Sequence, residues 1–378
     1  MPTYFLKTQF LLLVLTSFLL LNSGCKKIPT QPPDNNNLND TTSHLITWKI
    51  DDIGTYGSYL KDVAIIDENN IWAVGQIYMN DSLGNPEAQA YNAAHWDGSK
   101  WELKRIYYYG ACSAVDYPSL IAIWAFSDSN LAITNGGSIG WFDGRKVRLD
   151  CGVNPLLTGA INKMWGTSNS DLYVVGNNGN IAHYDGKSWQ KIESGTNVRL
   201  TDVYGSPDGS VVWVAGFDDS YGTVFLRNKG KGFEKVLEIT DPRPSYQPGQ
   251  ITKVFKSLWT DKVDTVYLGA IGRVYAAPLN TSGETEENIW WDDENQHTFP
   301  PETNVIRGTG GNDIFVGGYL QFIQHYNGKT WKSYPEIEGN GTWRSMAVSK
   351  KIVVAVGEQY GSIGNGGARI AIGYKINK

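Results

Sequence analysis

The sequence is poor in the residues from which metal and redox sites are built. Only 3 of its 378 residues are cysteine, 4 are methionine and 5 are histidine. Positive charge is not in excess either, since 33 lysines and arginines stand against 38 aspartates and glutamates, a formal net charge of −5. A chain of this charge offers no basic field to nucleic acid. We therefore expect no metal, no cofactor and no nucleic-acid partner.

Long hydrophobic runs are also missing, with one exception near the N-terminus. Residues 10–21, FLLLVLTSFLLL, follow the positive charge of Lys7 and have the length of a secretory signal, which is too short to span a bilayer comfortably. The run leads into LLNSGC, which ends at Cys25. This ending resembles the signal of bacterial lipoproteins, in which the cysteine becomes the first residue and is diacylated.

The resemblance implies that a lipid on Cys25 holds the protein on a membrane. Asn22 stands where that family favours leucine, and the alternative is a plain secretory signal with an incidental cysteine. Lys26 follows in place of the aspartate that typically retains such proteins at the inner membrane. We therefore expect a cell-envelope protein anchored to the outer membrane.

Residues 26–45 are polar and rich in proline and asparagine. Such a segment cannot bury enough apolar surface to offset the entropy lost on ordering. We expect a signal peptide over 1–25, a flexible tether over 26–45 and a folded body over 46–378.

Glycine (42), tyrosine (21) and tryptophan (14) are abundant, a composition typical of many short strands joined by tight turns. A unit repeats along the folded body and is clearest over 164–192, MWGTSNSDLYVVGNNGNIAHYDGKSWQKI. The copies are 60, 41, 40, 53, 49 and 39 residues apart when aligned on the end of an apolar strand, at Gly75, Asn135, Gly176, Gly216, Gly269, Gly318 and Gly357. A period of about 40 residues with four short strands predicts a seven-bladed β-propeller.

The last copy lacks its fourth strand, because the chain ends at 370–378, IAIGYKINK. The missing strand has a counterpart at the other end of the body, where ITWKID (46–51) matches SWQKIE (188–193). We predict that this N-terminal strand completes the last blade, which closes the ring and removes an exposed sheet edge.

The segment HYDGKSW (183–189) has the composition of an active site, but it recurs as HWDGSKW (95–101), WFDGRKV (141–147) and HYNGKTW (325–331). Copies on separate blades cannot all be catalytic, so we interpret His95, His183 and His325 as one structural column. The Asp-Gly and Asn-Gly pairs predict type I′ hairpin turns with positive φ at both positions. A second column, on the inner strands, is expected to pack between blades and consists of Trp124, Trp165, Tyr204 and Trp259.

The unit WGxxxxDlyvVG…GxIxHYDGxxW resembles repeats of secreted and lipid-anchored bacterial β-propeller proteins, and the resemblance spans 46–378. It implies the fold and leaves the function open. The Asp-box of sialidase-like propellers separates Asp from Gly by one residue, whereas here the two are adjacent. The marks of kelch and WD40 repeats are largely missing.

In an up-and-down propeller the second-to-third loops and the blade connections share one face, and here those segments are the long ones. Long loops on a rigid face are the usual place for binding. The candidate ligand-binding residues on this face are Tyr78, Tyr91, Tyr107, Tyr108, Tyr109, Tyr117, Tyr246 and Tyr360. The alternative for any one of them is that it packs the loop to which it belongs.

Cys112 and Cys151 lie at matching places in adjacent repeats, 12 and 14 residues before Trp124 and Trp165. An exported protein can hold such a pair as a disulfide, and the alternative is two free thiols.

No nucleophile elbow, zinc spacing or phosphate-binding loop is present, so we assign no catalytic residue. We expect a monomeric, lipid-anchored binding protein that presents its aromatic loops to a glycan or a protein. One alternative is a glycan hydrolase or lyase, because Asp62 and Asp202 share an inner-strand column, which Lys163 and Arg344 are expected to occupy too. Another is a scaffold subunit of an envelope assembly.

Overall fold

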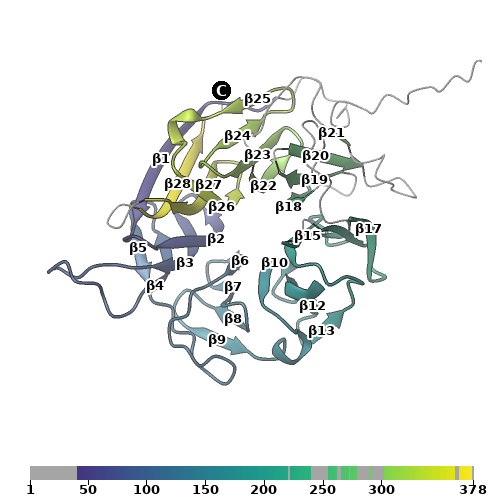
Figure 1. The fold of residues 1–378 in the computed structure, drawn as a ribbon, viewed down its shortest axis with the longest axis horizontal. Helices are drawn as coiled ribbons and strands as arrows, with labels where there is room; N and C mark the ends of the chain where they lie inside the picture. The colour runs from purple at the N-terminus through teal and green to yellow at the C-terminus, as the bar shows by residue number, and fades with distance from the viewer. Residues whose placement is uncertain are drawn as a thin grey trace, which may run out of the picture.

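Seven four-stranded antiparallel sheets surround a central axis in the computed structural model, as Figure 1 shows. The structure describes residues 41–219, 222–239, 254–261, 265–271, 273–278, 290–291, 302–361 and 366–376. The predicted seven-bladed β-propeller is confirmed. The predicted signal peptide with Cys25, most of the tether and Tyr246 lie outside the described residues.

Each blade runs outward from an inner strand at the axis. Blade 1 consists of β2 (Tyr59–Asp67), β3 (Asn70–Ile77), β4 (Tyr91–Trp96) and β5 (Trp101–Lys104). Blade 2 consists of β6 (Ala122–Ser127), β7 (Asn130–Thr134), β8 (Ile139–Phe142) and β9 (Val147–Asp150). Blade 3 consists of β10 (Ile161–Ser168), β11 (Asp171–Gly176), β12 (Ile181–Tyr184) and β13 (Trp189–Ile192). Blade 4 consists of β14 (Leu200–Gly205), β15 (Val212–Phe217), β16 (Thr223–Asn228) and β17 (Phe233–Ile239).

The remaining blades complete the circle. Blade 5 consists of β18 (Phe255–Trp259), β19 (Thr265–Ala270), β20 (Arg273–Pro278) and β21 (Trp290–Trp291). Blade 6 consists of β22 (Thr303–Gly310), β23 (Asp313–Gly318), β24 (Ile323–Tyr326) and β25 (Trp331–Ser333). Blade 7 consists of β26 (Gly341–Val348), β27 (Ile352–Gln359), β28 (Gly367–Lys375) and β1 (Ile46–Ile53). Short 3-10 helices are η1 (Asn154–Leu156), η2 (Asn177–Gly179) and η4 (Pro335–Ile337), and no described helix has the length and apolarity needed to cross a bilayer.

The core lies between blades, because each sheet packs its apolar side chains against both neighbours. Middle strands are therefore buried on both faces and read as apolar runs, as Leu172, Val174 and Val175 of β11 show. The inner-strand aromatic column packs between blades as predicted. The Trp124 indole donates to the Gly166 carbonyl of the next blade at 2.9 Å, and the Trp165 ring lies so close to Gly205 that no larger residue fits there.

The ring closes through the N-terminal strand, as predicted. β1 pairs with β28 in antiparallel register from Ile46 opposite Lys375 to Ile53 opposite Ala368. The blade that contains both ends of the folded body therefore has four strands, as the other blades do, and its outer edge is β1.

A repeated β-bulge explains the glycine that marks the repeat. In β10, Ile161 pairs with Gly176 and Lys163 with Val175, so Asn162 is the extra residue. A Cβ on Gly176 would lie 2.1 Å from the Ala160 carbonyl oxygen, too close for any side chain. The same crowding, at 1.8–2.5 Å, occurs in four other blades, at Gly75, Gly216, Gly318 and Gly357. The glycine therefore recurs in the repeat because the bulge leaves no room for a side chain at this position.

One detail of the predicted alignment is corrected. In blade 2 the pairing of β6 with β7 begins at Ala122 opposite Thr134, and Asn135 follows directly, as the alignment places it. In blade 5 the residue opposite the strand start is Ala270, which pairs with Phe255, so the predicted equivalence of Gly269 was one residue off.

The Asp-Gly turns also differ from the prediction. Gly98, Gly144, Gly186 and Gly328 have φ between 86° and 94°, but the Asp or Asn before each does not have positive φ, so these are not type I′ turns. Instead the carboxylate of Asp97 accepts hydrogen bonds from the backbone N–H groups of Ser99 at 2.8 Å and Lys100 at 2.9 Å. Donation from Lys100 and Ser99 lowers the pKa of Asp97 to about 2. The aspartate is thus an acceptor for turn N–H groups.

The histidine column is structural, as interpreted from the sequence. Each ring stacks on the aromatic side chain opposite it in its own blade, with ring centroids 4.2–4.3 Å apart: His95 on Trp72, His183 on Tyr173 and His325 on Phe315. Each Nε2 bonds to a side-chain oxygen of the second strand, at Asn70, Asp171 and Asp313.

Residues 41–45 form a strap that crosses the end of blade 6 before β1 begins. Thr42 donates from its N–H to the Asn327 carbonyl at 3.3 Å, and Tyr334 donates from its hydroxyl to the His44 carbonyl at 3.0 Å. The Nδ1 atoms of His44 and His325 are 2.9 Å apart, so one must donate and the other accept. This contact requires that the accepting ring stays neutral.

Acid should therefore release the strap. The pKa of His44 is lowered to about 4, first by burial and then by the positive charges of His325 and Lys332; burial also lowers the pKa of His325, against the opposing effect of Asp313. A histidine in an unfolded chain has a pKa of about 6.5. Between pH ~6.5 and ~4 the undocked strap therefore binds more protons than the docked strap. Docking of the strap weakens as the pH falls through this range.

We expect the hydrogen-exchange protection factor of the Thr42 amide to fall across this window, and His44→Gln to flatten the dependence. His183→Gln, which alters an equivalent ring outside the strap, is the control. An identical pH profile in wild type and His44→Gln would contradict this account.

Candidate functional site

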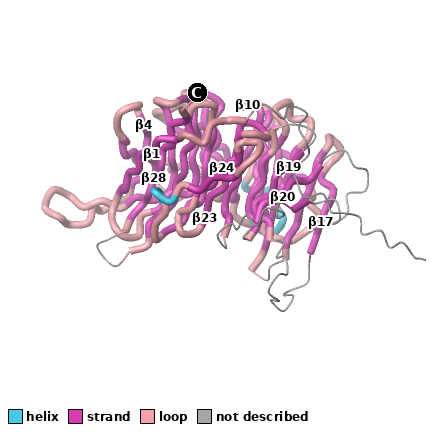
Figure 2. The backbone as a smooth tube through the Cα atoms, turned by 90° about the horizontal axis from the view of Figure 1, so that it is seen from above, coloured by secondary structure: helices cyan, strands magenta, loops and turns pink. Residues whose placement is uncertain are grey.

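The two faces of the disc are built from different connections. First-to-second and third-to-fourth turns lie on one face, the turn face, and the second-to-third loops and blade connections lie on the other, the loop face, as the edge-on view in Figure 2 illustrates. Of the eleven exposed large hydrophobic side chains among the described residues, eight lie in loop-face connections: Tyr56, Tyr78, Leu83, Tyr107, Tyr109, Val115, Leu320 and Tyr360. We call these eight the apolar crescent, because they belong to blades 6, 7, 1 and 2 in succession.

Three tyrosines form the aromatic centre of the crescent. Tyr107 and Tyr109 are 54% and 53% exposed, and the half-buried Tyr117 lies beside them. The ring centroids of Tyr107 and Tyr109 are 6.2 Å apart, and those of Tyr107 and Tyr117 are 5.8 Å apart with the rings at 68°. We call these three residues the tyrosine cluster.

Buried contacts hold the loop that carries the cluster. Cys112 and Cys151 are joined by a disulfide, with Cα atoms 5.5 Å apart, which ties the connection between blades 1 and 2 to that between blades 2 and 3. Asn92, which is 1% exposed, donates to the carbonyls of Ile106 and Pro118 at both ends of the loop. The cluster is thus presented on a fixed support.

Tyr108 is not a surface residue, which corrects its prediction as a ligand-binding residue. It is fully buried, its hydroxyl donates to the Ser138 carbonyl at 2.6 Å, and burial raises its pKa. Neighbours in an extended segment point in opposite directions, so Tyr108 points inward while Tyr107 and Tyr109 point outward.

The other predicted tyrosines lie apart from the cluster. Tyr78 and Tyr360 are 40% and 41% exposed. Tyr91 is half-buried, and the Arg105 guanidinium covers its ring at 3.8 Å from the centroid. In the described part of the chain no ring contact joins these three to Tyr107, Tyr109 or Tyr117.

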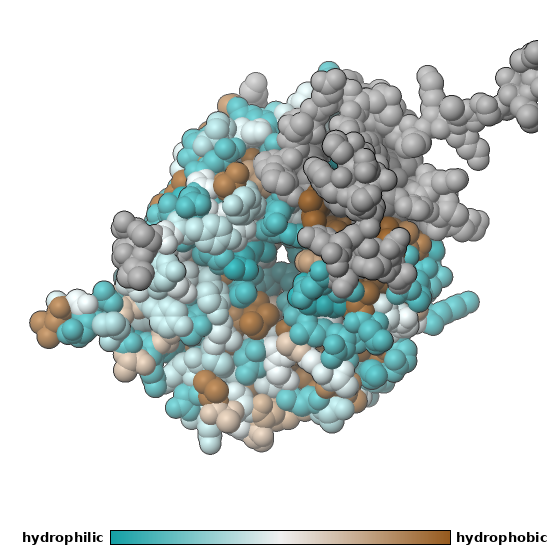
Figure 3. Space-filling model, viewed as in Figure 1, coloured by the Kyte–Doolittle hydropathy of each residue, from teal (hydrophilic) through white to brown (hydrophobic). Residues whose placement is uncertain are grey.

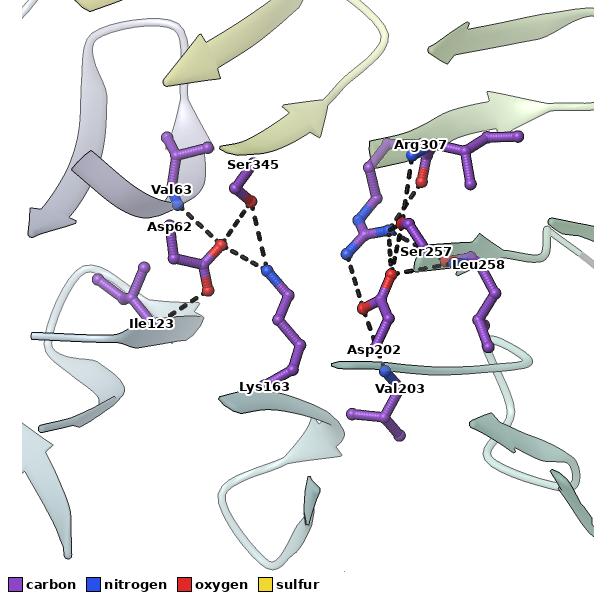
Figure 4. A network of polar contacts seen from close by, with 11 residues as sticks. Asp62, Val63, Ile123, Lys163, Asp202, Val203, Ser257, Leu258, Arg307 and Ser345 are labelled. Carbon is purple, nitrogen blue, oxygen red and sulfur yellow. Dashed lines mark hydrogen bonds and ion pairs between the residues drawn. The ribbon is translucent and has the colours of Figure 1, made fainter. Parts of the chain in front are cut away.

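The central channel holds two polar networks, shown in Figure 4. Asp62 of blade 1 accepts hydrogen bonds from Ser345 of blade 7 at 2.6 Å, from the Ile123 N–H of blade 2 at 3.0 Å, and from Lys163 of blade 3 at 2.5 Å. One carboxylate therefore joins four blades.

Asp202 of blade 4 joins three blades on the other side of the channel. It accepts a bidentate pair from Arg307 of blade 6 at 2.9 and 3.0 Å, and bonds from Ser257 at 2.5 Å and the Leu258 N–H at 3.0 Å in blade 5. Burial opposes ionisation of Asp202, but the charges of Arg307 and Lys163 and these hydrogen bonds outweigh it, so its pKa is lowered. Asp202 is thus an ionised structural tie.

These ties satisfy a particular need of the fold. The inner strand of each blade is a sheet edge with N–H groups that have no strand partner, and a buried N–H must find an acceptor. Asp62, Asp202 and Ser257 accept the N–H of Ile123, Leu258 and Ile306, each in the next blade. A glycosidase acid instead requires a carboxyl with a raised pKa. The lowered pKa of Asp202 therefore favours a structural role over hydrolysis.

Because of the bulge, the prediction that Arg344 shares the inner-strand column of Asp62 is wrong. Ser345 pairs with Val356 and shares the column of Asp62, whereas Arg344 is the extra residue of the bulge between Trp343 and Ser345. Arg344 therefore lies one step nearer to the loop face. Among the described residues no cluster of three histidine, cysteine or acidic side chains could hold a metal ion.

Comparisons with known proteins extend the description of the fold. No family model matches the chain, and no curated protein matches it. Similar solved structures include "YCF48 bound to D1 peptide", with a TM-score of 0.60 at 13% identity over 89% of this chain and 97% of that one. YCF48 from Cyanidioschyzon merolae gives 0.59 at 12% identity over 86% and 98%, and the WD40 propeller domain of Doa1 gives 0.56 at 11% identity over 88% and 98%. At these identities the likeness defines a class, the β-propellers.

The Cys112–Cys151 disulfide should contribute about 4 kcal/mol, because it closes a loop with a sequence separation of 39. We expect the Cys112→Ser/Cys151→Ser variant to lose about that free energy of unfolding, measured by urea denaturation. Alkylation of denatured, unreduced protein, mapped by mass spectrometry, should leave both residues unmodified. Alkylation of both would refute the disulfide.

Asp202→Asn should destabilise the ring strongly, because it leaves the Arg307 guanidinium buried without its charge partner. Breaking such a pair costs about 3–5 kcal/mol, and Asp202→Asn/Arg307→Met should regain part of this. Lys351→Met is the matched control, since it breaks a solvent-exposed pair with Glu68, and such pairs contribute little to stability. Equal losses in Asp202→Asn and Lys351→Met would contradict the assignment of a structural tie.

Proposed function

We propose that this protein is a cell-envelope binding protein and that the apolar crescent on its loop face docks a protein partner. The observation that carries the proposal is the asymmetry of the surface. Among the described residues, eight of the eleven exposed large hydrophobic side chains belong to four successive blades on one face. A concentration of exposed apolar side chains on one face favours an interaction site there, and tyrosine is enriched among the residues that dominate binding energy.

The shape of the tyrosine cluster supports a protein over a glycan. A sugar ring stacks on an open, flat aromatic face, whereas Tyr107 is flanked by Tyr109 and, nearly edge-on, by Tyr117. Rings tilted against one another present edges and hydroxyl groups, which suit side chains and backbone amides. A propeller of similar fold has been solved with a bound peptide, YCF48 with the D1 peptide.

The strap indicates which face of the disc would point toward the membrane. Thr42 contacts Asn312 and Asn327, which lie in first-to-second and third-to-fourth turns, so the strap begins at the turn face. A lipid on Cys25 would therefore attach the turn face to the membrane by way of the tether. The loop face would then point away from the membrane, free to meet a partner; the outer membrane remains our proposed location.

The test is a photo-crosslinking amino acid placed at Val115 in the full-length protein in its native cells. We expect a crosslinked product whose partner is destroyed by protease and not by periodate. The same photo-crosslinking amino acid at Lys187, on the turn face, should give no such product. Tyr107→Ser/Tyr109→Ser/Tyr117→Ser should weaken binding of the recovered partner at least about tenfold.

Leu45→Ser/Ile376→Ser, which removes exposed apolar side chains away from the loop face, should leave that affinity unchanged. A product that periodate destroys would assign the face to a glycan. Equal affinity in the triple variant and wild type would overturn the proposal.

A further inference from the structure

A ring of bulge residues surrounds the loop-face mouth of the channel. The extra residue of each bulge occupies the same place near the start of the inner strand, one step toward the loop face from the channel networks. The six residues are Lys61, Asn162, Thr201, Lys256, Asn304 and Arg344. We call them the bulge ring.

The neutral members of the bulge ring tie blades together. Asn162 donates to the Leu200 carbonyl at 2.9 Å, Thr201 to the Lys256 carbonyl at 3.1 Å, and Asn304 to the Trp343 carbonyl at 3.2 Å. Each acceptor belongs to the next blade. Their positions in the ring thus have a structural explanation.

Two of the three cations are neutralised within the protein. Lys256 donates to Asn304 at 3.1 Å and pairs with Glu302 at 3.4 Å. Arg344 forms a bidentate pair with Glu358 through Nε and Nη2, both at 2.5 Å. Neither contact uses Nη1 of Arg344.

Lys61 differs from both. Among the described residues it forms no hydrogen bond and no ion pair, and its ammonium lies 5.1 Å from the centroid of the Tyr59 ring. It is half-buried. Its pKa is lowered, first by burial and then by the positive charge of Arg344, which Glu358 only partly offsets. Lys61 and Arg344 occupy equivalent bulge positions in adjacent blades, and the single carboxylate of Glu358 offsets only part of their combined positive charge.

The location connects Lys61 with the proposed binding face. Lys61 and Arg344 belong to blades 1 and 7, in the middle of the apolar crescent. The Tyr59 hydroxyl bonds to Ser119 at 3.1 Å, and Ser119 follows Tyr117 of the tyrosine cluster by two residues. Figure 3 shows hydrophilic residues around the central opening. A partner on the tyrosine cluster is therefore within reach of this charge.

We infer that Lys61 and Arg344 bind a carboxylate of the protein partner, either an acidic side chain or a chain terminus, and this rests on the proposed function. Nζ of Lys61 supplies up to three N–H groups, and Nη1 of Arg344 supplies two more. With Glu358 balancing Arg344, one positive charge is in surplus, which matches a carboxylate better than a phosphate group of about −1.5 to −2.

The test uses small carboxylates as probes, so that it does not depend on the partner. N-acetylglutamate α-amide represents a side chain and N-acetylalanine a chain terminus; galacturonate and inorganic phosphate are comparators. We expect saturable shifts of the Lys61 Cε NMR signal with one or both amino-acid probes, and the stronger of the two identifies the source of the carboxylate.

Lys61→Gln and Arg344→Gln should each weaken that binding about tenfold or more, as loss of a charged hydrogen bond does. Binding is then followed by calorimetry. Lys61→Arg should retain it, and Lys256→Gln, which removes a neutralised cation, should leave it unchanged; thermal unfolding checks that each variant is folded. Unaltered binding in folded Lys61→Gln, or tighter binding of galacturonate or phosphate than of both amino-acid probes, would overturn the inference.

The two proposals can fail separately. Carboxylate binding with full partner affinity in the tyrosine triple variant would overturn the docking face and leave the carboxylate site. Loss of partner affinity in the triple variant without any carboxylate binding would overturn the carboxylate site and leave the docking face.

Discussion

The antiparallel pairing of β1 with β28 converts seven sheets into a closed ring. Each blade buries its apolar faces against two neighbours, so an open chain of blades would expose one face at each end as well as the strand edge of β28. The eight paired positions from Ile46 to Ile53 remove that edge and hold the two ends of the folded body in one sheet. The strap, the inner-strand columns and the division into two faces all follow from this closure.

The channel networks show why a propeller with central carboxylates need not be an enzyme. Seven inner strands present N–H groups toward the axis, and a short acidic or hydroxyl side chain from the preceding blade can accept them. Asp62 and Asp202 perform this task and are neutralised by Lys163 and Arg307, which reach across two blades. Since these oxygens already accept four or five hydrogen bonds, they have little capacity left to bind water or substrate.

Much of the fold could be predicted because a repeat is a local pattern, and strand closure could be predicted because ITWKID matches a missing copy. The errors arose where one residue shifts the register. The bulge moved Arg344 out of the column of Asp62, and it moved the blade 5 equivalence from Gly269 to Ala270. The pairing of Asp62 with Lys163 spans 101 residues, and no sequence pattern links the two. Alternation alone could have separated Tyr108 from its exposed neighbours.

The position of the apolar crescent follows from the same construction. On the turn face, the Asp-Gly hairpins are tight, and their carboxylates are occupied with turn N–H groups, so little side-chain surface is free to vary. The loop face carries the connections that the ring does not constrain. The crescent lies across blades 7 and 1, where β1 closes the ring and where Lys61 and Arg344 belong to the bulge ring. A partner bound there would contact both sides of the closure, so it would bind only the closed ring and would stabilise that ring by mass action.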